Sequence, residues 1–356
     1  MQINSIHFYV TDARNTSNWF INYLGFQLVD VVRDSNALTV AIAKRTIFLI
    51  FSCPLRNSGA VARYLDSHAE GIVDLSFRVR DLNSIINRAN YYDIEVLQKI
   101  QQQGLIKYSC LAGWQDLQHT LIEATSPFNY YRLPNGKLRR FRGSKKTHPA
   151  TLTFNSIDHI VLNVAQNKLS QAVTYYQNLF NFQIQQTFQI KTDRSGLYSQ
   201  ALIDTTGTVQ FNINEPTTAN SQIQEFIDLN GSAGIQHLAL RSSNLIQDVA
   251  KMRSLGVLFL PIPAAYYAHL RQRLNRDLVR LTELQSIIEQ SILIDWQQHN
   301  RESLLMQIFT QPILAKPTFF LEFIERRQQA VGFGEGNFQA LFAAVEQSTI
   351  NTIHQK

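Results

Sequence analysis

Short segments in which apolar and polar residues alternate dominate the chain and predict a protein built mainly from strands. Residues 4–10, 37–51 and 71–79 have the two-residue period or the continuous apolar character of half-buried and buried strands. Residues 15–23 and 81–90 instead have the three- and four-residue spacing of helices. Strands therefore alternate with a few helices, and we expect an α+β fold.

The same order of segments occurs twice along the chain. Four blocks recur in one order: NSIHFYV with NSIDHIVLNV, SNWFINYLGFQLV with SQAVTYYQNLFNFQI, GIVDLSF with GIQHLAL, and HTLIEAT with TFFLEFI. Matched blocks in one order indicate an internal duplication. The sequence predicts two domains of duplicated βαβββ units, each forming a curved, mostly antiparallel, open barrel-like sheet with flanking helices.

The length of 356 residues also favours two domains over one. We expect one domain at residues 1–136, a linker at 137–150 and a second domain at 151–356. The second domain contains an insertion, residues 264–292, whose leucines recur at three- and four-residue steps. This insertion is predicted to be an amphipathic helical cover for the sheet.

The net charge of +6 is concentrated in the linker. Six basic residues lie there: Lys137, Arg139, Arg140, Arg142, Lys145 and Lys146. Without them the chain is close to neutral, and no interleaved aromatic platform accompanies them. We therefore expect a solvated connection and no nucleic-acid partner.

Two further features indicate where in the cell the protein is located. No run of about 18 uncharged apolar residues is present, so no membrane span is expected. The two cysteines, Cys53 and Cys110, lie far apart and favour a reducing compartment. With no secretory leader in the first residues, these features predict a cytoplasmic protein.

One carboxylate interrupts the apolar pattern of the second half. Glu322 lies in a predicted strand beside Phe320, Leu321, Phe323 and Ile324. A carboxylate among so many apolar side chains is costly unless it is paired with a cation or bound to a metal. Glu322 therefore requires a positive partner.

The duplication indicates which residues share that partner. Aligning the repeats by their motifs pairs Phe8 with His159, Asp74 with His237, and Glu123 with Glu322. Two histidines and one carboxylate leave about three positions of an octahedral metal free, an arrangement that suits non-haem Fe(II) and dioxygen. A single histidine on a strand is typical of an ordinary core. Two histidines and a glutamate at three repeat-equivalent strand positions instead predict a metal site in the second half, and the first half, which has Phe8 in place of a ligand, is predicted to have none.

Seven segments resemble one known family from about residue 4 to the end of the chain. They are INSIHFYV, IDHIVLNV, INEP, SQIQEFIDLNGSAGIQHLAL, LLMQIFT, PTFFLEFIERR and GFGEGNF. The chain resembles the 4-hydroxyphenylpyruvate dioxygenases of the vicinal oxygen chelate superfamily. The resemblance implies Fe(II) held by His159, His237 and Glu322, and a homodimer or homotetramer.

The resemblance also implies a substrate pocket. Its polar members would be Ser199, Asn214, Gln222, Gln236 and Gln307, and its aromatic members Phe309, Phe320, Phe333 and Phe338. Amide side chains can hold the phenol and carboxylate ends of a substrate without adding charge, and rings can pack on its arene. The glycines around Phe333 indicate a lid. Asn212 departs from the expectation, since an apolar residue would be expected near the pocket.

The implied reaction converts 4-hydroxyphenylpyruvate and O₂ to homogentisate and CO₂, in tyrosine catabolism or in the supply of quinone and tocopherol precursors. Three alternatives use related folds. A hydroxymandelate synthase would oxidise the benzylic carbon of the same substrate, although Phe309 and the aromatic wall favour attack on the ring. An extradiol ring-cleaving dioxygenase would leave the INEP and GFGEGNF segments unexplained. A non-catalytic small-molecule-binding protein would not need the metal ligands of the second half.

Overall fold

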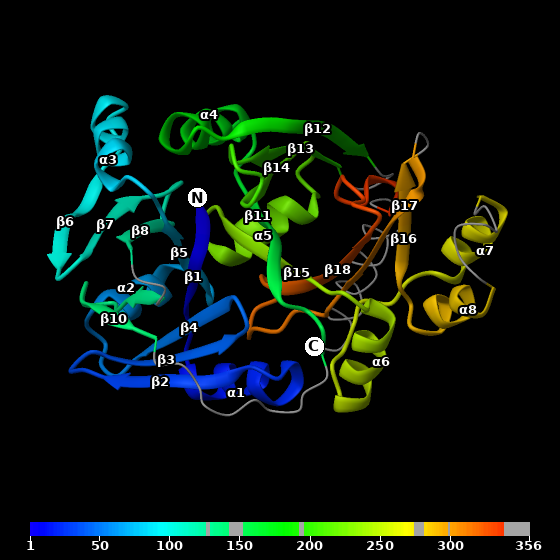
Figure 1. Ribbon diagram of the computed structural model, residues 1–356, viewed down its shortest axis with the longest axis horizontal. Helices are drawn as coiled ribbons and strands as arrows, with labels where there is room; N and C mark the ends of the chain where they lie inside the picture. The colour runs from blue at the N-terminus through cyan, green and yellow to red at the C-terminus, as the bar shows by residue number, and fades with distance from the viewer. Residues whose placement is uncertain (126–128, 142–151, 192–195, 274–280, 298–299, 338–356) are drawn as a thin grey trace.

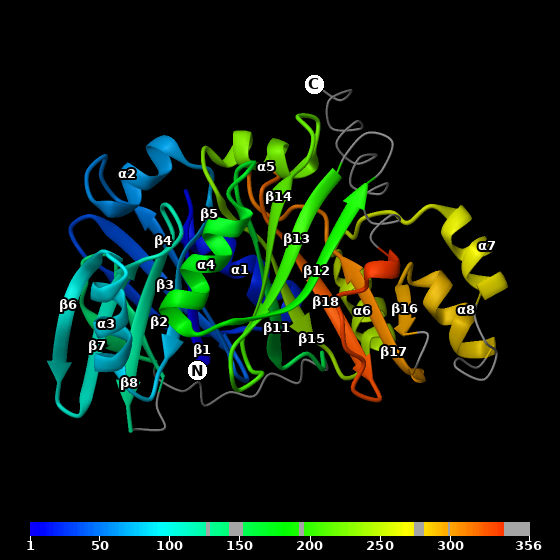
Figure 2. The ribbon, with the colours of Figure 1, turned by 90° about the horizontal axis from the view of Figure 1, so that it is seen from above.

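Two eight-stranded sheets with the same strand order form the protein (Figure 1). The computed structural model describes residues 1–125, 129–141, 152–191, 196–273, 281–297 and 300–337. Within these residues the two halves of the chain lie side by side, the first in blue to cyan and the second in green to orange (Figure 2).

The first sheet has the order β2-β3-β4-β1-β5-β8-β7-β6. Its strands are β1 (Gln2–Tyr9), β2 (Gln27–Arg33), β3 (Ala37–Lys44), β4 (Ile47–Pro54), β5 (Gly71–Arg78), β6 (Val96–Gln103), β7 (Ile106–Ala112) and β8 (Gln118–Ala124). Its helices are α1 (Ala13–Leu24), α2 (Ala60–Ser67) and α3 (Leu82–Tyr91). Helices α1 and α3 correspond to the two predicted helices, and each begins after an aspartate, Asp12 or Asp81, that caps it.

The second sheet repeats this arrangement as β12-β13-β14-β11-β15-β18-β17-β16. Its strands are β11 (Ser156–Asn163), β12 (Gln183–Lys191), β13 (Gly196–Ile203), β14 (Gln210–Pro216), β15 (Gly234–Arg241), β16 (Leu293–Gln297), β17 (Asn300–Phe309) and β18 (Phe320–Arg327). Its helices are α4 (Leu169–Phe180), α5 (Gln222–Asn230), α6 (Leu245–Leu255), α7 (Ala264–Arg273) and α8 (Leu281–Glu289), followed by the 3₁₀ turn η1 (Glu335–Asn337).

The pairing within the sheets confirms the predicted βαβββ duplication. Each half contains two units, and in every unit the first strand pairs in parallel with the last. These pairs are β1 with β4, β5 with β8, β11 with β14, and β15 with β18. The other neighbouring strands of the two sheets are antiparallel. The two units of each half meet at the pairs β1–β5 and β11–β15. The predicted α+β class and the mostly antiparallel sheets are therefore confirmed.

The alignment of the repeats by sequence motif was wrong at two of its three positions. Each half has a β-bulge in its first strand, between Ile3 and Ser5 and between Ile157 and His159. The next residue of β1, Ile6, pairs with Leu75, and the corresponding Ile160 pairs with Leu238. The structural counterpart of His159 is therefore Ser5. Phe8 instead lies in the core between the halves, with its ring 5.1 Å from that of Phe319.

The counterpart of Glu322 is likewise Thr120, and Glu123 corresponds to Glu325. Both glutamates accept a hydrogen bond from the first residue of a helix, Glu123 from Leu82 at 2.8 Å and Glu325 from Leu245 at 2.6 Å. The motif comparison failed because similar residues recur three positions apart along these strands. Only the hydrogen-bond register between strands shows which residues of the two halves correspond. Asp74 opposite His237 was correct, since His7 pairs with Asp74 and Val161 with His237 around the same second bulge.

The first half continues beyond the boundary predicted at residue 136. Strand β9 (Tyr130–Arg132) pairs with β10 (Leu138–Arg140) in a separate hairpin, and the Phe141 ring packs on Tyr131. Arg139 in this hairpin forms an ion pair with Asp30 at 3.1 Å. At least the start of the basic segment therefore belongs to the first half, while Arg142, Lys145 and Lys146 lie outside the described residues.

The insertion at residues 264–292 contains two helices in its described parts, α7 and α8, with residues 274–280 undescribed. They lie at the end of the molecule farthest from the first sheet (Figures 1 and 2). Tyr267 donates its hydroxyl to the carbonyl of Ile292 at 3.1 Å, which ties α7 to the edge of the second sheet beside β16. Across the described part of the chain, no helix combines the length and apolar character needed to cross a bilayer.

Candidate metal centre

His159, His237 and Glu322 lie on three adjacent strands of the second sheet. His159 on β11 and Glu322 on β18 both pair with Ala239 of the central strand β15, one from each side. His237 precedes Ala239 by two residues and so lies on the same face of the sheet. The small side chain of Ala239, which is fully buried, leaves the space between the two flanking residues open.

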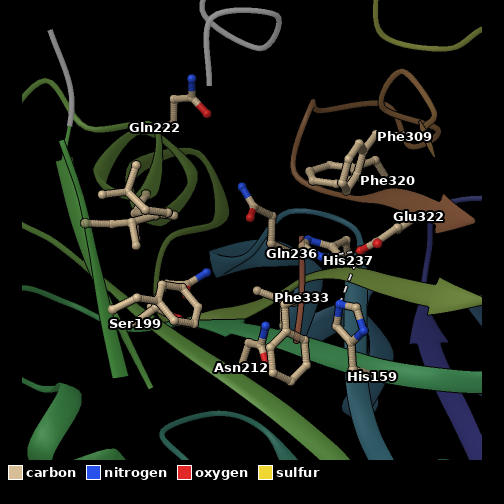
Figure 3. Close-up of a pocket in the computed structure, with 16 residues that line it drawn as sticks. His159, Ser199, Asn212, Gln222, Gln236, His237, Phe309, Phe320, Glu322 and Phe333 are labelled. Carbon is tan, nitrogen blue, oxygen red and sulfur yellow. Dashed lines mark ion pairs between the residues drawn. The ribbon is translucent and has the colours of Figure 1, made fainter. Parts of the chain in front are cut away.

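The three side chains converge on one point (Figure 3). The Nε2 atoms of His159 and His237 are 3.2 and 3.5 Å from Glu322 Oε2. One ligand atom from each residue lies within 4.8 Å of the others. His159 and Glu322 are each 2% exposed, so the cluster lies deep in the protein.

The hydrogen bonds of the cluster fit a bound cation. Glu322 Oε1 and His237 Nδ1 are buried, and neither has a hydrogen-bond partner among the described residues. Asp158 Oδ1 lies 3.0 Å from His159 Nδ1, and this contact leaves Nε2 to face Glu322. An unpaired buried carboxylate oxygen is costly, and a divalent metal would satisfy it.

The electrostatics of the cluster lead to the same conclusion. Although burial opposes a charged imidazole, the carboxylates of Glu322 and Asp158 raise the pKa of His159 to about 9. Burial alone would raise the pKa of the Glu322 carboxyl, but the two imidazoles lower it. Burial lowers the pKa of His237 despite its contact with Glu322. The Glu322 carboxylate therefore remains ionised and attracts positive charge, which a metal ion can supply.

The first half has no such ligand set at the corresponding positions, Ser5, Asp74 and Thr120. Asp74 Oδ1 accepts a hydrogen bond from the Thr120 backbone at 2.8 Å, and its other oxygen accepts from the Thr120 hydroxyl. Its carboxylate is thus satisfied by neighbouring protein groups. The only potential ligand cluster in the described residues is the one in the second half.

A cavity opens directly beside the cluster. Seven residues predicted from the resemblance line it together with the three candidate ligands: Ser199, Asn214, Gln222, Gln236, Phe309, Phe320 and Phe333. Six lining residues were not predicted as members of the pocket: Val161, Phe188, Ile190, Leu197, Asn212 and Ile223. Phe338 lies outside the described residues. The cavity combines an apolar lining with a few convergent polar groups, as small-molecule sites do.

A second β-bulge places Gln236 in the cavity. Val161 pairs with His237 and Leu162 with Ile235, so Gln236 is the extra residue between them. Adjacent residues of a regular strand face opposite sides of the sheet, whereas a bulge re-aims one side chain. Gln236 and His237 therefore both face the cavity (Figure 3).

Amides and a hydroxyl form the wall of the cavity across from the metal cluster. Ser199 on β13 pairs with Asn214 on β14, and the Asn214 amide donates to Asn163 Oδ1 at 3.2 Å. Ser199 Oγ is buried and has no partner among the residues described. Gln222 is the first residue of α5 and also lines the cavity. This wall can hydrogen-bond a polar ligand without contributing charge.

Aromatic rings pack on the two histidines. The Phe320 ring stacks on His237 with centroids 4.7 Å apart, and Phe309 meets Phe320 edge-on at 6.1 Å. Phe333 meets His159 edge-on at 5.1 Å. The rings therefore hold both imidazoles in place and line the space beside them.

Gln307 is the one described member of the predicted pocket that does not line this cavity. It is fully buried on β17, and neither atom of its amide has a partner within the described chain. Gly334 lies against it so closely that a Cβ atom at position 334 would be 2.2 Å from Gln307 Oε1. Gln307 thus packs against Gly334 in residues 330–337, which we call the Phe333 segment.

Asn212 was noted from the sequence only as a departure from an apolar expectation. It lies on β14 opposite Val161, is 5% exposed and lines the cavity beside Phe333 (Figure 3). Its Oδ1 atom has no hydrogen-bond partner among the residues that the structure describes. A buried amide oxygen without a protein partner is costly, and it can accept a hydrogen bond from a ligand.

Comparison with known proteins gives relatives over the whole chain. Residues 156–277 match the model of the glyoxalase/bleomycin resistance protein/dioxygenase superfamily. The chain is 35% identical to an uncharacterized protein of Synechocystis sp. over 97% of both chains. It is 32% identical to 4-hydroxyphenylpyruvate dioxygenase of Xenopus tropicalis, covering 97% of this chain and 91% of that protein. The enzyme of the same name from Danio rerio is 30% identical over 97% and 90% of the two chains.

Among solved structures, a triple mutant of 4-hydroxymandelate synthase from Streptomyces coelicolor is similar with a TM-score of 0.85. The two chains are 24% identical, and the match covers 98% of each. This similarity extends to both halves, and at that identity it establishes the shared fold.

Proposed function

Because the chain belongs to the 4-hydroxyphenylpyruvate dioxygenase family, we propose that it converts 4-hydroxyphenylpyruvate and O₂ to homogentisate and CO₂. The relatives and the family model together identify the chain as a dioxygenase of the vicinal oxygen chelate superfamily. The proposal adds the substrate, the product and Fe(II) as the metal held by His159, His237 and Glu322.

One observation supports this assignment above the others. His159 and Glu322 flank the buried Ala239 from the two adjacent strands, and His237 lies two residues before Ala239 on the same strand. The Glu322 carboxylate has an oxygen without a protein partner among the described residues. Two histidines and one carboxylate hold a metal through three positions and leave the others for exchangeable ligands. The open side of the cluster faces the cavity, where a small molecule can reach it.

Bound Fe(II) would supply the chemistry that activates dioxygen beside an α-keto acid. The residues of the chain would position the substrate and exclude water, which is the part that a protein contributes to such chemistry. Gln236, next to the candidate ligand His237, would orient the polar end of the substrate near the metal. Ser199, Asn214 and Gln222 would bind its other polar end by hydrogen bonds.

The aromatic residues would hold the arene. Phe309 and Phe320 form one side of the cavity, and Phe333 borders it near His159. Rings in these places keep bulk water from the metal face and present a flat apolar surface to the substrate. We expect this arrangement to direct the ring of the substrate toward the metal, which would favour ring hydroxylation with side-chain migration.

Hydroxymandelate synthesis is the competing reaction on the same substrate, and the product separates the two. The protein is purified anaerobically, loaded with Fe(II) and incubated with 4-hydroxyphenylpyruvate and O₂. Homogentisate supports the proposal, whereas hydroxymandelate assigns oxidation to the benzylic carbon. Metal uptake without oxygen consumption, or no metal uptake at all, contradicts the enzymatic assignment and favours a non-catalytic binding protein.

The cellular setting that we propose follows from the family. The enzyme would act in the cytoplasm as a homodimer or homotetramer, in tyrosine catabolism or in the supply of quinone and tocopherol precursors. Product identification in cell extracts and size measurement of the purified protein test these points separately.

A further inference from the structure

Arg326 on β18 connects the metal cluster to the Phe333 segment. Its guanidinium donates from Nη2 to Asp158 Oδ1 at 2.6 Å and from Nε to Asp158 Oδ2 at 2.8 Å. Its third nitrogen, Nη1, donates to the backbone carbonyls of Ala330 at 3.1 Å and Gly332 at 2.7 Å. A single side chain, 7% exposed, therefore holds a buried carboxylate on one side and a loop on the other.

Asp158 transmits this contact to a candidate ligand. It is the extra residue of the first β-bulge in β11, and the bulge brings its side chain next to that of His159. Asp158 Oδ1 is 3.0 Å from His159 Nδ1. A carboxylate at one ring nitrogen keeps the proton there and leaves the other nitrogen to the metal. Because the planar guanidinium binds both carboxylate oxygens, it fixes the plane of the carboxylate and, through it, the His159 ring.

The other contacts of Arg326 determine where Phe333 lies. Gly332, whose carbonyl it binds, immediately precedes Phe333. The Phe333 ring lies edge-on to His159 at 5.1 Å, and the Arg326 guanidinium carbon is 6.0 Å from the centre of that ring. The same cation thus sets the orientation of a metal ligand and the position of the ring that packs on it.

The first half shows that the fold itself does not require this ion pair. The counterparts of Asp158 and Arg326 are Asn4 and Ala124, by the registers that relate Ser5 to His159 and Glu123 to Glu325. The bulge is retained there, but the Asn4 amide donates to the hydroxyl of Ser5 at 3.1 Å. Buried ion pairs are weak contributors to stability compared with apolar packing. Its occurrence only in the half with the ligand cluster indicates a role at the site.

We propose that Arg326 is a positioning residue that couples metal binding by His159 to the position of the Phe333 segment, in which the Phe333 ring packs on that histidine. The inference rests on the metal site of the proposed function. In this arrangement, metal binding stabilises His159 and Asp158, and these hold Arg326 where it binds the carbonyls of Ala330 and Gly332. Loss of the guanidinium loosens the ligand and the segment together.

The test compares four variants in two measurements. Arg326→Gln removes the cation, Arg326→Lys retains charge without the fork, and Asp158→Asn/Arg326→Gln removes the pair without leaving one buried charge. Arg327→Gln is the matched control, because Arg327 is the next residue of β18 and pairs with Glu283 and Glu325 away from the cluster. Co(II) affinity is measured by calorimetry, and backbone hydrogen exchange of residues 328–337 by mass spectrometry.

Co(II) should bind Arg326→Gln and the double variant about 10–100-fold more weakly than the wild type, the range for losing a group that orients a ligand. Exchange in residues 328–337 should slow on Co(II) addition in the wild type and in Arg327→Gln, but not in these two variants. Arg326→Lys should recover part of the metal affinity and little of the protection, since one ammonium cannot bind the carboxylate and both carbonyls.

Each contrary outcome overturns a defined part of the reasoning. Wild-type Co(II) affinity in the double variant refutes the inference. Weakened affinity also refutes it if Co(II) still slows hydrogen exchange in residues 328–337 as it does in the wild type, because the ligand and the segment would then be independent. If circular dichroism shows Arg326→Gln unfolded, the double variant decides. Failure of the wild-type protein itself to bind Co(II) refutes the proposed metal site, and it is distinguished by appearing before any substitution is made.

Discussion

At Gly334, the structure predicts that one added methyl group would clash with the fully buried amide of Gln307. The φ angle of Gly334 is +78°, and a Cβ atom would lie 2.2 to 2.6 Å from three atoms of the Gln307 amide group. A left-handed conformation costs a residue with a Cβ roughly 1–2 kcal/mol. Overpacking a buried site adds about 1–3 kcal/mol. Gly334→Ala should therefore cost about 2–5 kcal/mol, expressed as unfolding or as displacement of the Phe333 segment.

Gly104 supplies the matched control for the conformational part. Its φ angle is +62°, and a Cβ atom there would meet nothing within 4 Å. Gly104→Ala should cost only about 1–2 kcal/mol. The two variants are compared by urea unfolding and by initial rates with 4-hydroxyphenylpyruvate. Because the Phe333 ring moves with its segment, Gly334→Ala should also raise KM for that substrate, while Gly104→Ala should not.

Removing the opposing side chain tests the cause directly. In Gln307→Ala/Gly334→Ala the amide is absent, so the penalty of the second substitution should fall to the value seen for Gly104→Ala. The reasoning is refuted if Gly334→Ala matches Gly104→Ala in both stability and KM. It is also refuted if the Gln307 truncation leaves the penalty unchanged.

Three further predictions concern other buried groups. Glu322→Gln should weaken metal binding by more than about 100-fold, beyond the range for groups that only orient ligands. Glu325→Gln should retain the metal and lose about 1–2 kcal/mol of stability at the start of α6. Equal loss of metal in both variants would contradict the assignment of Glu322 as a ligand. Burial lowers the pKa of His119 from 6.5 to about 4, so the unfolded chain binds this proton more readily and stability falls as pH decreases through that interval. Between pH 7 and 5 the wild type should lose about 2 kcal/mol more than His119→Gln, measured by urea unfolding, and parallel losses would refute the cause. Asn212→Leu should raise stability by about 1 kcal/mol, because it removes a buried amide oxygen that has no partner among the described residues. It should also raise KM about tenfold if a ligand uses that amide, and unchanged stability and KM would exclude the contact.

Much of the fold could be predicted from the sequence. Alternating segments identified the strands, and the recurrence of NSI, GIV and GIQ blocks revealed the duplication, because each half must bury one face of a sheet with the same pattern. Helices α1 and α3 were predicted to within two residues. The prediction missed α2, α5 and α6, which span only 8, 9 and 11 residues, so the helical period extends over few turns.

The members of the metal cluster were also predictable, since Glu322 among phenylalanines demands a cation wherever the strand lies. Their relation to the first half was not. The motif alignment paired His159 with Phe8, whereas the register pairs it with Ser5. Both alignments place an apolar strand in a sheet, so the local sequence pattern cannot show which of the two is right.

What only the tertiary structure decided is the identity of the neighbours of each ligand. Side chains alternate with a period of two, so a single extra residue reverses which ones face the cavity. Bulges at Asp158 and Gln236 make two such changes, and they place a carboxylate beside His159 and an amide beside His237. Arg326 completes the arrangement from a strand more than 160 residues away, at 2.6 Å from Asp158. The sequence determined which residues can bind a metal, and strand register and long-range packing determined what orients them, because those depend on hydrogen bonds between segments that are distant along the chain.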